Sequence, residues 1–182
     1  MKITVVGSGK VGGGLADLWQ RAGHEVTRLG REGGDVGEAE VVLLAVPGGA
    51  VSEALHNLSG LDGKTVIDAT NLIGVTAPAG YASNAEFVKS RTDGPTAKAF
   101  NINFASLYER LGAARAKPGN LWCGDAEARE AVEQLSCDAG YEPIYAGVLA
   151  NAATLEATMK LVFAVSQGMG PFVYRMAAPE EL

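Results

Sequence analysis

Three glycines near the start of the chain have the spacing of a phosphate-binding loop. Gly7, Gly9 and Gly12 form a GxGxxG pattern between the strand-like residues 2–6 and a segment with helical spacing. In such a loop the first glycine permits a tight turn, the second lets the backbone approach a pyrophosphate, and the third lets helix and strand pack closely. The helix N-terminus adds free N–H groups and a positive dipole. The sequence therefore predicts dinucleotide binding, and the alternative is a glycine turn without a ligand.

The residues after the second predicted strand, 25–29, indicate which dinucleotide is bound. NAD-selective proteins place an acidic side chain there, where it accepts a hydrogen bond from the ribose 2′-OH. This chain has Gly30 and Arg31 instead. A guanidinium group can donate two hydrogen bonds to a 2′-phosphate, with Arg28 as a second donor, so we predict NADP. Two alternatives stay open: Arg31 is a solvated loop residue, or Glu32 binds the ribose.

The sequence contains few candidates for acid–base catalysis. His24 precedes the second strand and His56 lies in a predicted helix, so both are expected to be structural. Asp68 lies in a predicted strand, where a buried carboxylate bonded to loops is favoured over a general base. No metal-ligand or nucleophile motif is present, and no metal is expected. Hydride transfer between two flat rings requires mainly their juxtaposition, so this pattern agrees with a ring cofactor as the redox partner.

Short apolar segments alternate with helical ones along the chain, a pattern typical of an α/β fold. We expect strands over 2–6, 25–29, 41–46, 64–69, 97–101, 120–123 and 141–145. We expect helices from the glycine loop to residue 23, over 51–55, over 127–139, and over 149–175 with an interruption at 168–171. Residues 30–40 are expected to be a loop because they are rich in glycine and acids, and residues 72–95 because they lack periodicity.

These elements predict a Rossmann fold: a doubly wound, mostly parallel sheet with a short C-terminal helical extension. Residues 1–145 would form the NADP-binding domain. Residues 146–182 would form a helical segment packed on the same domain or in a dimer interface. Apolar residues form a stripe along this segment: Leu149, Leu155, Met159, Val162 and Phe163. The stripe either completes the monomer core or makes a homodimer, and we favour the homodimer.

Composition and charge exclude several classes of protein. The 182 residues carry 15 Lys and Arg against 21 Asp and Glu, a net charge of −6, so nucleic acid is not an expected partner. Cys123 and Cys137 lack a metal-binding spacing and are expected to be buried thiols. The chain begins without a signal-peptide pattern, and no apolar run approaches about 18 residues. We expect a cytoplasmic protein without membrane contacts.

Several motifs occur together over nearly the whole chain. They are GSGKVGGGLA at Gly7–Ala16, GHEV followed by Gly30–Arg31, VVLLAVP at Val41–Pro47, KAFN at Lys98–Asn101, CGD at Cys123–Asp125, AGVLANA at Ala146–Ala152 and GMG at Gly168–Gly170. On these motifs the chain resembles the deazaflavin (coenzyme F-420)-dependent NADP reductases, and it is similar also to the cytosolic reductase domain of the STEAP metalloreductases. It departs from the family pattern at Gly30 and Gly48–Gly49, where those reductases often have Ser and bulky residues. Looser phosphate binding and a wider pocket are therefore expected.

The resemblance implies roles for named residues. The NADP-binding residues would be Gly7, Ser8, Gly9, Lys10, Val11, Gly12, Gly30 and Arg31. The loops Ala45–Val46–Pro47 and Ala69–Thr70–Asn71 would flank the nicotinamide half of the cofactor. Asn101 and the GMG turn with Met169 would border the acceptor pocket, and for Met169 a place in the apolar core is an equal alternative.

The expected function is hydride transfer between NADP(H) and a flat ring acceptor, such as coenzyme F-420 or a flavin. One alternative is a reductase of small imines or hydroxy acids, for which Lys160 is the one candidate catalytic lysine and is expected to be solvated. Another alternative is an NADP(H)-binding redox sensor without turnover.

Overall fold

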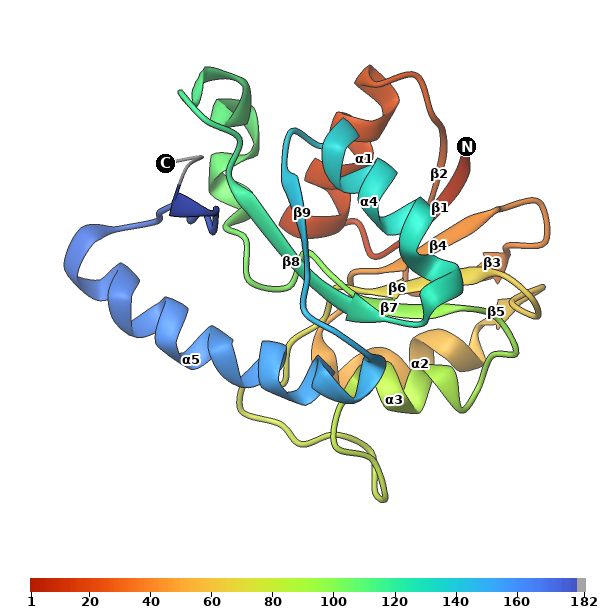
Figure 1. The fold of residues 1–182 in the computed structure, drawn as a ribbon. Coiled ribbons are helices and arrows are strands. Elements are labelled where there is room, and N and C mark those ends of the chain that lie inside the picture. The colour runs from red at the N-terminus through yellow and green to blue at the C-terminus, as the bar shows by residue number, and fades with distance from the viewer. Residues whose placement is uncertain (180–182) are drawn as a thin grey trace.

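A seven-stranded, mostly parallel sheet forms the centre of the structure, as the sequence predicts (Figure 1). The computed structural model describes residues 1–179, so residues 180–182 of the predicted C-terminal segment lie outside the described residues. The strands of this sheet are β1 (Lys2–Val6), β2 (Glu25–Leu29), β4 (Val41–Leu44), β6 (Thr65–Asp68), β7 (Thr96–Lys98), β8 (Gly119–Gly124) and β9 (Glu142–Tyr145). Two short strands, β3 (Gly34–Asp35) and β5 (Leu58–Ser59), pair separately.

The strand order places the start of the chain in the interior of the sheet. β2 lies on one side of β1 and β4 on the other, in the order β2-β1-β4-β6-β7-β8-β9. Neighbouring strands are parallel except β7 and β8, which run antiparallel. The chain leaves β1 first toward one edge and then toward the other. The crevice at the carboxyl ends of β1 and β4 is therefore a topological switch point, where sheets of this kind bind ligands.

Helices cover both faces of the sheet (Figure 1). One face carries α1 (Lys10–Arg21) and α4 (Arg129–Asp138). The other face carries α2 (Val51–His56), α3 (Asn84–Lys89) and the first turns of α5 (Ala152–Met169). Within the described residues, 3₁₀ helices connect these elements: η1 (Gly48–Ala50), η2 (Ala105–Ala113), η3 (Ala126–Ala128) and η4 (Leu149–Asn151).

Apolar side chains hold the layers together. All four residues of β4 are buried, as expected for a strand that is covered on both faces. Trp19 of α1 is fully buried, and its Nε1 donates a hydrogen bond of 2.9 Å to the carbonyl of Leu135 in α4. This bond satisfies the polar atom of the indole and joins the two helices on the same face of the sheet.

Several short elements differ from the sequence-based prediction. Residues 72–95 contain α3, which begins after Ser83, because the hydroxyl of Ser83 accepts a hydrogen bond from the N–H of Glu86. The helix spans only six residues, too few for a clear periodicity. β7 ends before Phe100, whose φ of 61° is incompatible with a strand. Residues 30–40, in contrast, contain only β3 and turns, so the second crossover helix is absent from this segment, as predicted.

The chain after α5 does not continue as a helix. Gly170 has a φ of 77° and ends α5, so the predicted helix up to residue 175 is wrong beyond Met169. The tail returns to the sheet instead: the N–H of Gly119 donates to the carbonyl of Tyr174, and the hydroxyl of Tyr174 accepts from the N–H of Leu121. Among residues 1–179, no helix has the length and apolar character required to cross a membrane.

The two cysteines lie in different environments. Both are free thiols. Cys123 on β8 is buried, as predicted, and its burial raises the pKa of the thiol to about 11. Cys137 on α4 is exposed, so the prediction of two buried thiols is wrong for this residue, because α4 turns it away from the sheet.

Candidate functional site

A cleft of about 510 Å³ lies at the carboxyl ends of β1, β2 and β4. Parallel strands end at the same edge of a sheet, so the loops that follow them meet there. The cleft is lined by Val6, Gly7, Ser8, Gly9, Gly30, Arg31, Gly33, Ala45, Val46, Pro47, Ala50, Glu53 and Ala54. It therefore combines the predicted glycine loop, the predicted arginine and the loop after β4, which are far apart in the sequence.

The glycine loop is built by close backbone contacts. Gly7 has a φ of 108°, and a Cβ atom there would lie 2.5 Å from the carbonyl oxygen of Ala45. A Cβ atom on Gly12 would lie 2.0 Å from the carbonyl oxygen of Gly7. A Cβ atom on Gly9 would have nothing within 4 Å. Gly7 and Gly12 are thus required by the fold itself. Gly9 leaves open space in the cleft, where a ligand can approach the protein backbone.

The N-terminus of α1 opens toward this space. Gly9 is the N-cap residue, and no side chain caps the helix. The first turn contains no acidic residue, and Lys10 is exposed at its start. Unpaired N–H groups, the helix dipole and a nearby ammonium group favour an anion such as a pyrophosphate.

Arg31 follows β2 and lines the cleft together with the glycine loop. Its backbone carbonyl accepts a hydrogen bond of 3.0 Å from Asn57, which fixes the loop, and its side chain forms no ion pair within the described part of the chain. Arg28, the predicted second donor, pairs instead with Asp17 of α1 at 2.7 Å and does not line the cleft. The structure therefore leaves one guanidinium group in the cleft.

Two carboxylates belong to the segments that form this part of the cleft. The oxygen atoms of Glu32 lie 2.7 and 2.9 Å from the position that a Cβ atom on Gly30 would take. Glu53 of α2 lines the cleft together with Ala50 and Ala54, and the sequence-based prediction missed all three. Their i, i+3 and i+4 spacing on one helix face is the signal that could have identified them.

Some predicted cofactor residues lie outside the cleft lining. Lys10, Val11 and Gly12 belong to the first turn of α1, and Gly12 is buried against β1 rather than exposed to the cleft. Asn71 follows β6, one strand further along the sheet. Its neighbour in space is Asn101, the predicted acceptor-pocket residue, which follows β7.

Asn71 and Asn101 bind each other in both directions. The side-chain amide of Asn71 donates a hydrogen bond of 2.6 Å to the carbonyl of Asn101. The side-chain amide of Asn101 donates to Asn71 Oδ1 at 3.0 Å and to the carbonyl of Leu155 in α5 at 3.1 Å. The two loops and α5 are thus joined at the side of the sheet next to the loop after β4. A further amide, Asn84 of α3, donates to the carbonyl of Gly48 and to Thr70 Oγ1.

A buried charged cluster lies beneath these loops. Lys98 Nζ donates to Asp68 Oδ2 at 2.8 Å, to Glu156 Oε1 at 2.7 Å and to the carbonyl of Thr70. The other oxygen of Asp68 accepts a hydrogen bond of 2.9 Å from the N–H of Thr70. Asp68 is fully buried and bonded to a loop, as predicted. Its cationic partner, Lys98, was part of the KAFN motif but had no predicted role.

Glu156 is the less satisfied carboxylate of this cluster. Its Oε1 accepts hydrogen bonds from Lys98 and from the N–H of Asn84, whereas its Oε2 is buried without a hydrogen-bond partner among the described residues. Burial raises the pKa of Glu156, and the neighbouring Asp68 raises it further, against the lowering effect of Lys98. The cluster holds one ammonium group and two carboxyl groups, so a proton on Glu156 makes it electrically neutral.

Other candidate residues are not brought to the cleft. Met169 is 68% exposed at the end of α5, which supports neither a core position nor a place in the cleft. Lys160 is exposed on α5, as predicted. His24 bonds to Asp138 of α4 at 2.8 Å, and His56 is exposed at the end of α2. Within residues 1–179 no three His, Cys, Asp or Glu side chains group as metal ligands.

Comparison with known proteins adds evidence on the fold. No protein-family model and no curated protein sequence matches the chain. A protein from Arthrobacter sp. FB24, described as a candidate F420-dependent NADP reductase, has a TM-score of 0.79 at 22% identity, over 98% of this chain and 100% of that chain. A hypothetical protein from Sinorhizobium meliloti has a TM-score of 0.63 at 20% identity, over 98% and 93% of the two chains.

Longer enzymes share the same fold. A reductive aminase from Aspergillus terreus, solved in complex with NADPH and ethyl levulinate, has a TM-score of 0.68 at 18% identity over 92% of this chain. The match covers 61% of the aminase, so this chain spans about three fifths of that protein. At these identities the likeness shows a shared Rossmann-like fold and leaves activity to be argued from the site.

Proposed function

We propose that the protein is an NADP(H)-dependent oxidoreductase that transfers a hydride between NADP(H) and a flat ring acceptor. The observation that carries this proposal is that the glycine loop and Arg31 line one cleft at the switch point of the sheet. The nicotinamide ring supplies the hydride chemistry when it is bound. The residues of the chain bind the phosphates and hold the ring at the edge of the sheet.

The shape and charge of the cleft fit a phosphorylated dinucleotide. The pyrophosphate would lie against Gly9 and the uncapped first turn of α1, where the structure has open space and free donors. The 2′-phosphate would bind the guanidinium group of Arg31, which carries no ion pair within residues 1–179. Glu53 also lines the cleft, and its negative charge limits the phosphate affinity.

The residues around the nicotinamide half favour positioning over proton transfer. Ala45, Val46 and Pro47 supply an apolar wall after β4. Glu53, on α2, is the one acid–base side chain in the described lining of the cleft, and no histidine, lysine, cysteine or tyrosine of the described chain lies there. Reduction of an imine or a carbonyl requires a proton donor at the reacting atom. The conjugated ring of a deazaflavin or a flavin delocalises the negative charge that the hydride brings, so the ring can accept the hydride first and take its proton from solvent. A flat ring acceptor such as coenzyme F-420 or a flavin is therefore the acceptor that we propose.

The structural neighbours support the same chemistry. One neighbour, which this chain matches over its whole length, is described as a candidate F420-dependent NADP reductase. Others are reductive aminases and imine reductases in complex with NADPH or related dinucleotides. Lys160, the candidate lysine for the imine reaction, lies on the exposed surface of α5 and outside the cleft. The ring acceptor is therefore favoured over the imine.

Titration calorimetry with NADPH and NADH tests the cofactor assignment. We expect NADPH to bind at least about tenfold more tightly than NADH, a difference of about 1.4 kcal/mol. Arg31→Ala should abolish this preference. Arg28→Ala is the matched control, because Arg28 is the nearby arginine that pairs with Asp17 outside the cleft, and it should leave the preference unchanged. Equal binding of both dinucleotides by the wild type would overturn the NADP assignment.

Turnover identifies the acceptor. NADPH is mixed with oxidised coenzyme F-420, with FMN, or with a cyclic imine, and the absorbance of NADPH is followed. We expect oxidation with a ring acceptor and none with the imine. Oxidation with the imine alone would favour the reductase of small molecules, and tight NADPH binding without turnover with any acceptor would favour a redox sensor.

A further inference from the structure

Gly48 directly follows the apolar wall of the cleft, residues 45–47, and is enclosed on two sides. It begins η1, whose last residue, Ala50, also lines the cleft. A Cβ atom on Gly48 would lie 2.2 Å from the carbonyl oxygen of Asn71 and 3.3 Å from the side-chain nitrogen of Asn84. Only a residue without a side chain fits here, so the position of the wall depends on the backbone contacts of Gly48.

Asn84 joins the wall to the loop after β6. Its side-chain nitrogen donates a hydrogen bond of 3.0 Å to the carbonyl of Gly48 and one of 2.9 Å to Thr70 Oγ1. Because a carbonyl oxygen can only accept, the contact with Gly48 fixes which end of the amide is the nitrogen. Both hydrogen atoms of this nitrogen are therefore engaged, one at each loop.

Packing alone would not favour an asparagine at position 84. The side chain of Asn84 is fully buried, and its Oδ1 has no hydrogen-bond partner among the described residues. A buried acceptor without a donor lowers the stability of the fold. An apolar side chain of similar size would avoid this loss, but it would not hold the carbonyl of Gly48. The asparagine therefore contributes a fixed position for the backbone of η1.

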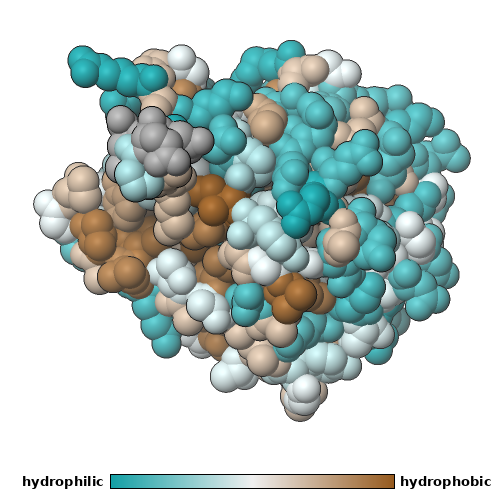
Figure 2. All heavy atoms as spheres, in the orientation of Figure 1, coloured by the Kyte–Doolittle hydropathy of each residue, from teal (hydrophilic) through white to brown (hydrophobic). Residues whose placement is uncertain are grey.

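The backbone of Asn84 is tied to the buried charged cluster. Its N–H donates a hydrogen bond of 3.3 Å to Glu156 Oε1, the oxygen that also accepts from Lys98. Lys98 in turn donates to the carbonyl of Thr70. Glu156 is buried, and only the outer face and the later turns of α5 reach the surface, where Figure 2 shows hydrophobic residues. The enclosed cluster thus holds Asn84 and Thr70 in a fixed relation.

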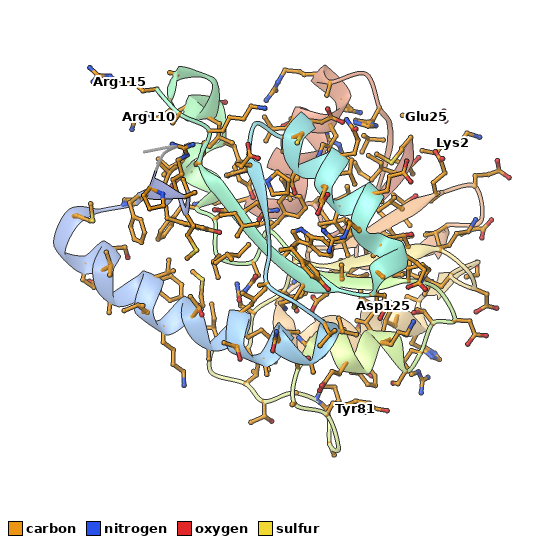
Figure 3. The ribbon with its side chains drawn as sticks, viewed as in Figure 1. Lys2, Glu25, Tyr81, Arg110, Arg115 and Asp125 are labelled. Carbon is orange, nitrogen blue, oxygen red and sulfur yellow. The ribbon has the colours of Figure 1, made fainter. Side chains whose placement is uncertain are left out.

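Helix α3 is a firm support for Asn84, its first residue. Near its start, the ring of Tyr81 lies 5.4 Å from the ring of Phe87. At its end, Lys89 Nζ pairs with Asp125 at 2.8 Å. Figure 3 shows Tyr81 and Asp125 beside α3. Because α3 is anchored near both ends, the amide of Asn84 has a fixed place from which it sets the position of the wall.

We propose that Asn84 is a positioning residue for the nicotinamide half of the cofactor. By holding the carbonyl of Gly48, it fixes residues 47–50 and with them the wall against which the ring would lie. The inference rests on the proposed function, because it requires that the cleft binds NADP(H). Asn84 does not line the cleft, so its effect should be confined to the ring and should leave phosphate binding at the glycine loop and Arg31 unchanged.

Titration with two ligands separates the ring from the phosphates. The ligands are NADPH and 2′-phospho-ADP-ribose, which has the phosphates of NADPH and lacks the nicotinamide ring. We expect Asn84→Ala to weaken NADPH about fivefold or more, and to change the affinity for 2′-phospho-ADP-ribose by less than about twofold. The fluorescence of bound NADPH should also lose the blue shift that an apolar wall gives the wild-type complex, a change that destabilisation alone would not produce.

Asn120→Ala is the matched control. Asn120 is another fully buried asparagine, and its side-chain bonds to Phe100, Asn103 and Ser136 involve no residue of the cleft lining. This variant should lower the melting temperature and keep the ratio of the two affinities. Gly48→Ala is a second variant for the case that Asn84→Ala does not fold, because its methyl group would displace the same wall and should change the ratio in the same direction.

The outcomes distinguish this inference from the proposed function. A wild type that binds neither ligand would overturn the proposed function and this inference with it. A wild type that binds both ligands, with the same ratio of affinities in Asn84→Ala and in Gly48→Ala, would overturn the inference alone. Equal weakening of both ligands by Asn84→Ala would also contradict it, because the effect would then not be confined to the ring.

Discussion

Lys98 on β7 and Glu156 on α5 form a buried hydrogen bond of 2.7 Å between residues that are 58 positions apart. This bond ties the C-terminal helix to the sheet directly below the Thr70 and Asn71 loop. The carbonyl of the preceding residue, Leu155, accepts a hydrogen bond from the side chain of Asn101. α5 is therefore part of the framework that holds the two asparagine loops beside the candidate site, although it does not line the cleft.

The two carboxyl groups that contact Lys98 should respond differently to neutral replacements. In Asp68→Asn, the amide nitrogen must face a donor, either Lys98 Nζ or the N–H of Thr70, so we expect a loss of about 3 to 5 kcal/mol. In Glu156→Gln, the amide nitrogen can take the position of Oε2, which has no donor beside it in the described chain, so we expect a loss below about 1.5 kcal/mol. Urea unfolding at neutral pH measures both values, and equal losses would contradict this account.

Comparison of the wild type with Glu156→Gln also gives a prediction for the pH dependence of stability. Burial raises the pKa of Glu156 in the folded state above its ordinary value of 4.5. The folded protein therefore binds the proton more tightly than the unfolded chain, and this contribution to stability is complete below about 4.5 and lost as the pH rises through the raised value. The free energy of unfolding of the wild type should fall relative to Glu156→Gln as the pH rises. A constant difference across the range would show that folding does not raise the pKa of Glu156.

Local sequence signals were sufficient to predict the core of the fold and the glycine loop of the candidate site. The glycine spacing at Gly7, Gly9 and Gly12 lies within one short segment, and the apolar run of β4 reflects burial on both faces, so both could be predicted. The partner of Lys98 could not, because it depends on where α5 packs. Glu53 was missed for a related reason: the rotation of α2 about its axis decides which side chains face the cleft.

The way in which α5 packs on the domain also explains why the predictions for the C-terminal residues were partly wrong. The stripe of Leu149, Leu155, Met159, Val162 and Phe163 was expected to complete the core or make a dimer. Leu155, Met159 and Val162 are buried in the core, Leu149 is half-buried against it, and Phe163 is 40% exposed. The exposed residues lie on the opposite face. Met169 is exposed because it lies beyond the last buried turn of α5. No periodicity in the sequence distinguishes the two faces of a helix that is apolar on both.

Two glycines of the loop separate the stability of the fold from ligand binding. A methyl group on Gly12 would collide with the backbone oxygen of Gly7 at 2.0 Å, so Gly12→Ala should shift α1 away from β1, with a loss of about 1 to 3 kcal/mol in unfolding free energy. A methyl group on Gly9 meets no atom of the protein, so Gly9→Ala should change stability by less than about 1 kcal/mol. It would, however, occupy the space next to the helix N-terminus that a pyrophosphate needs. Calorimetric titration with NADPH should therefore show affinity weakened about tenfold or more, about 1.4 kcal/mol, for Gly9→Ala at unchanged melting temperature. If Gly9→Ala binds NADPH as tightly as the wild type, the phosphates do not lie against this loop, and the open space at Gly9 has no role in cofactor binding.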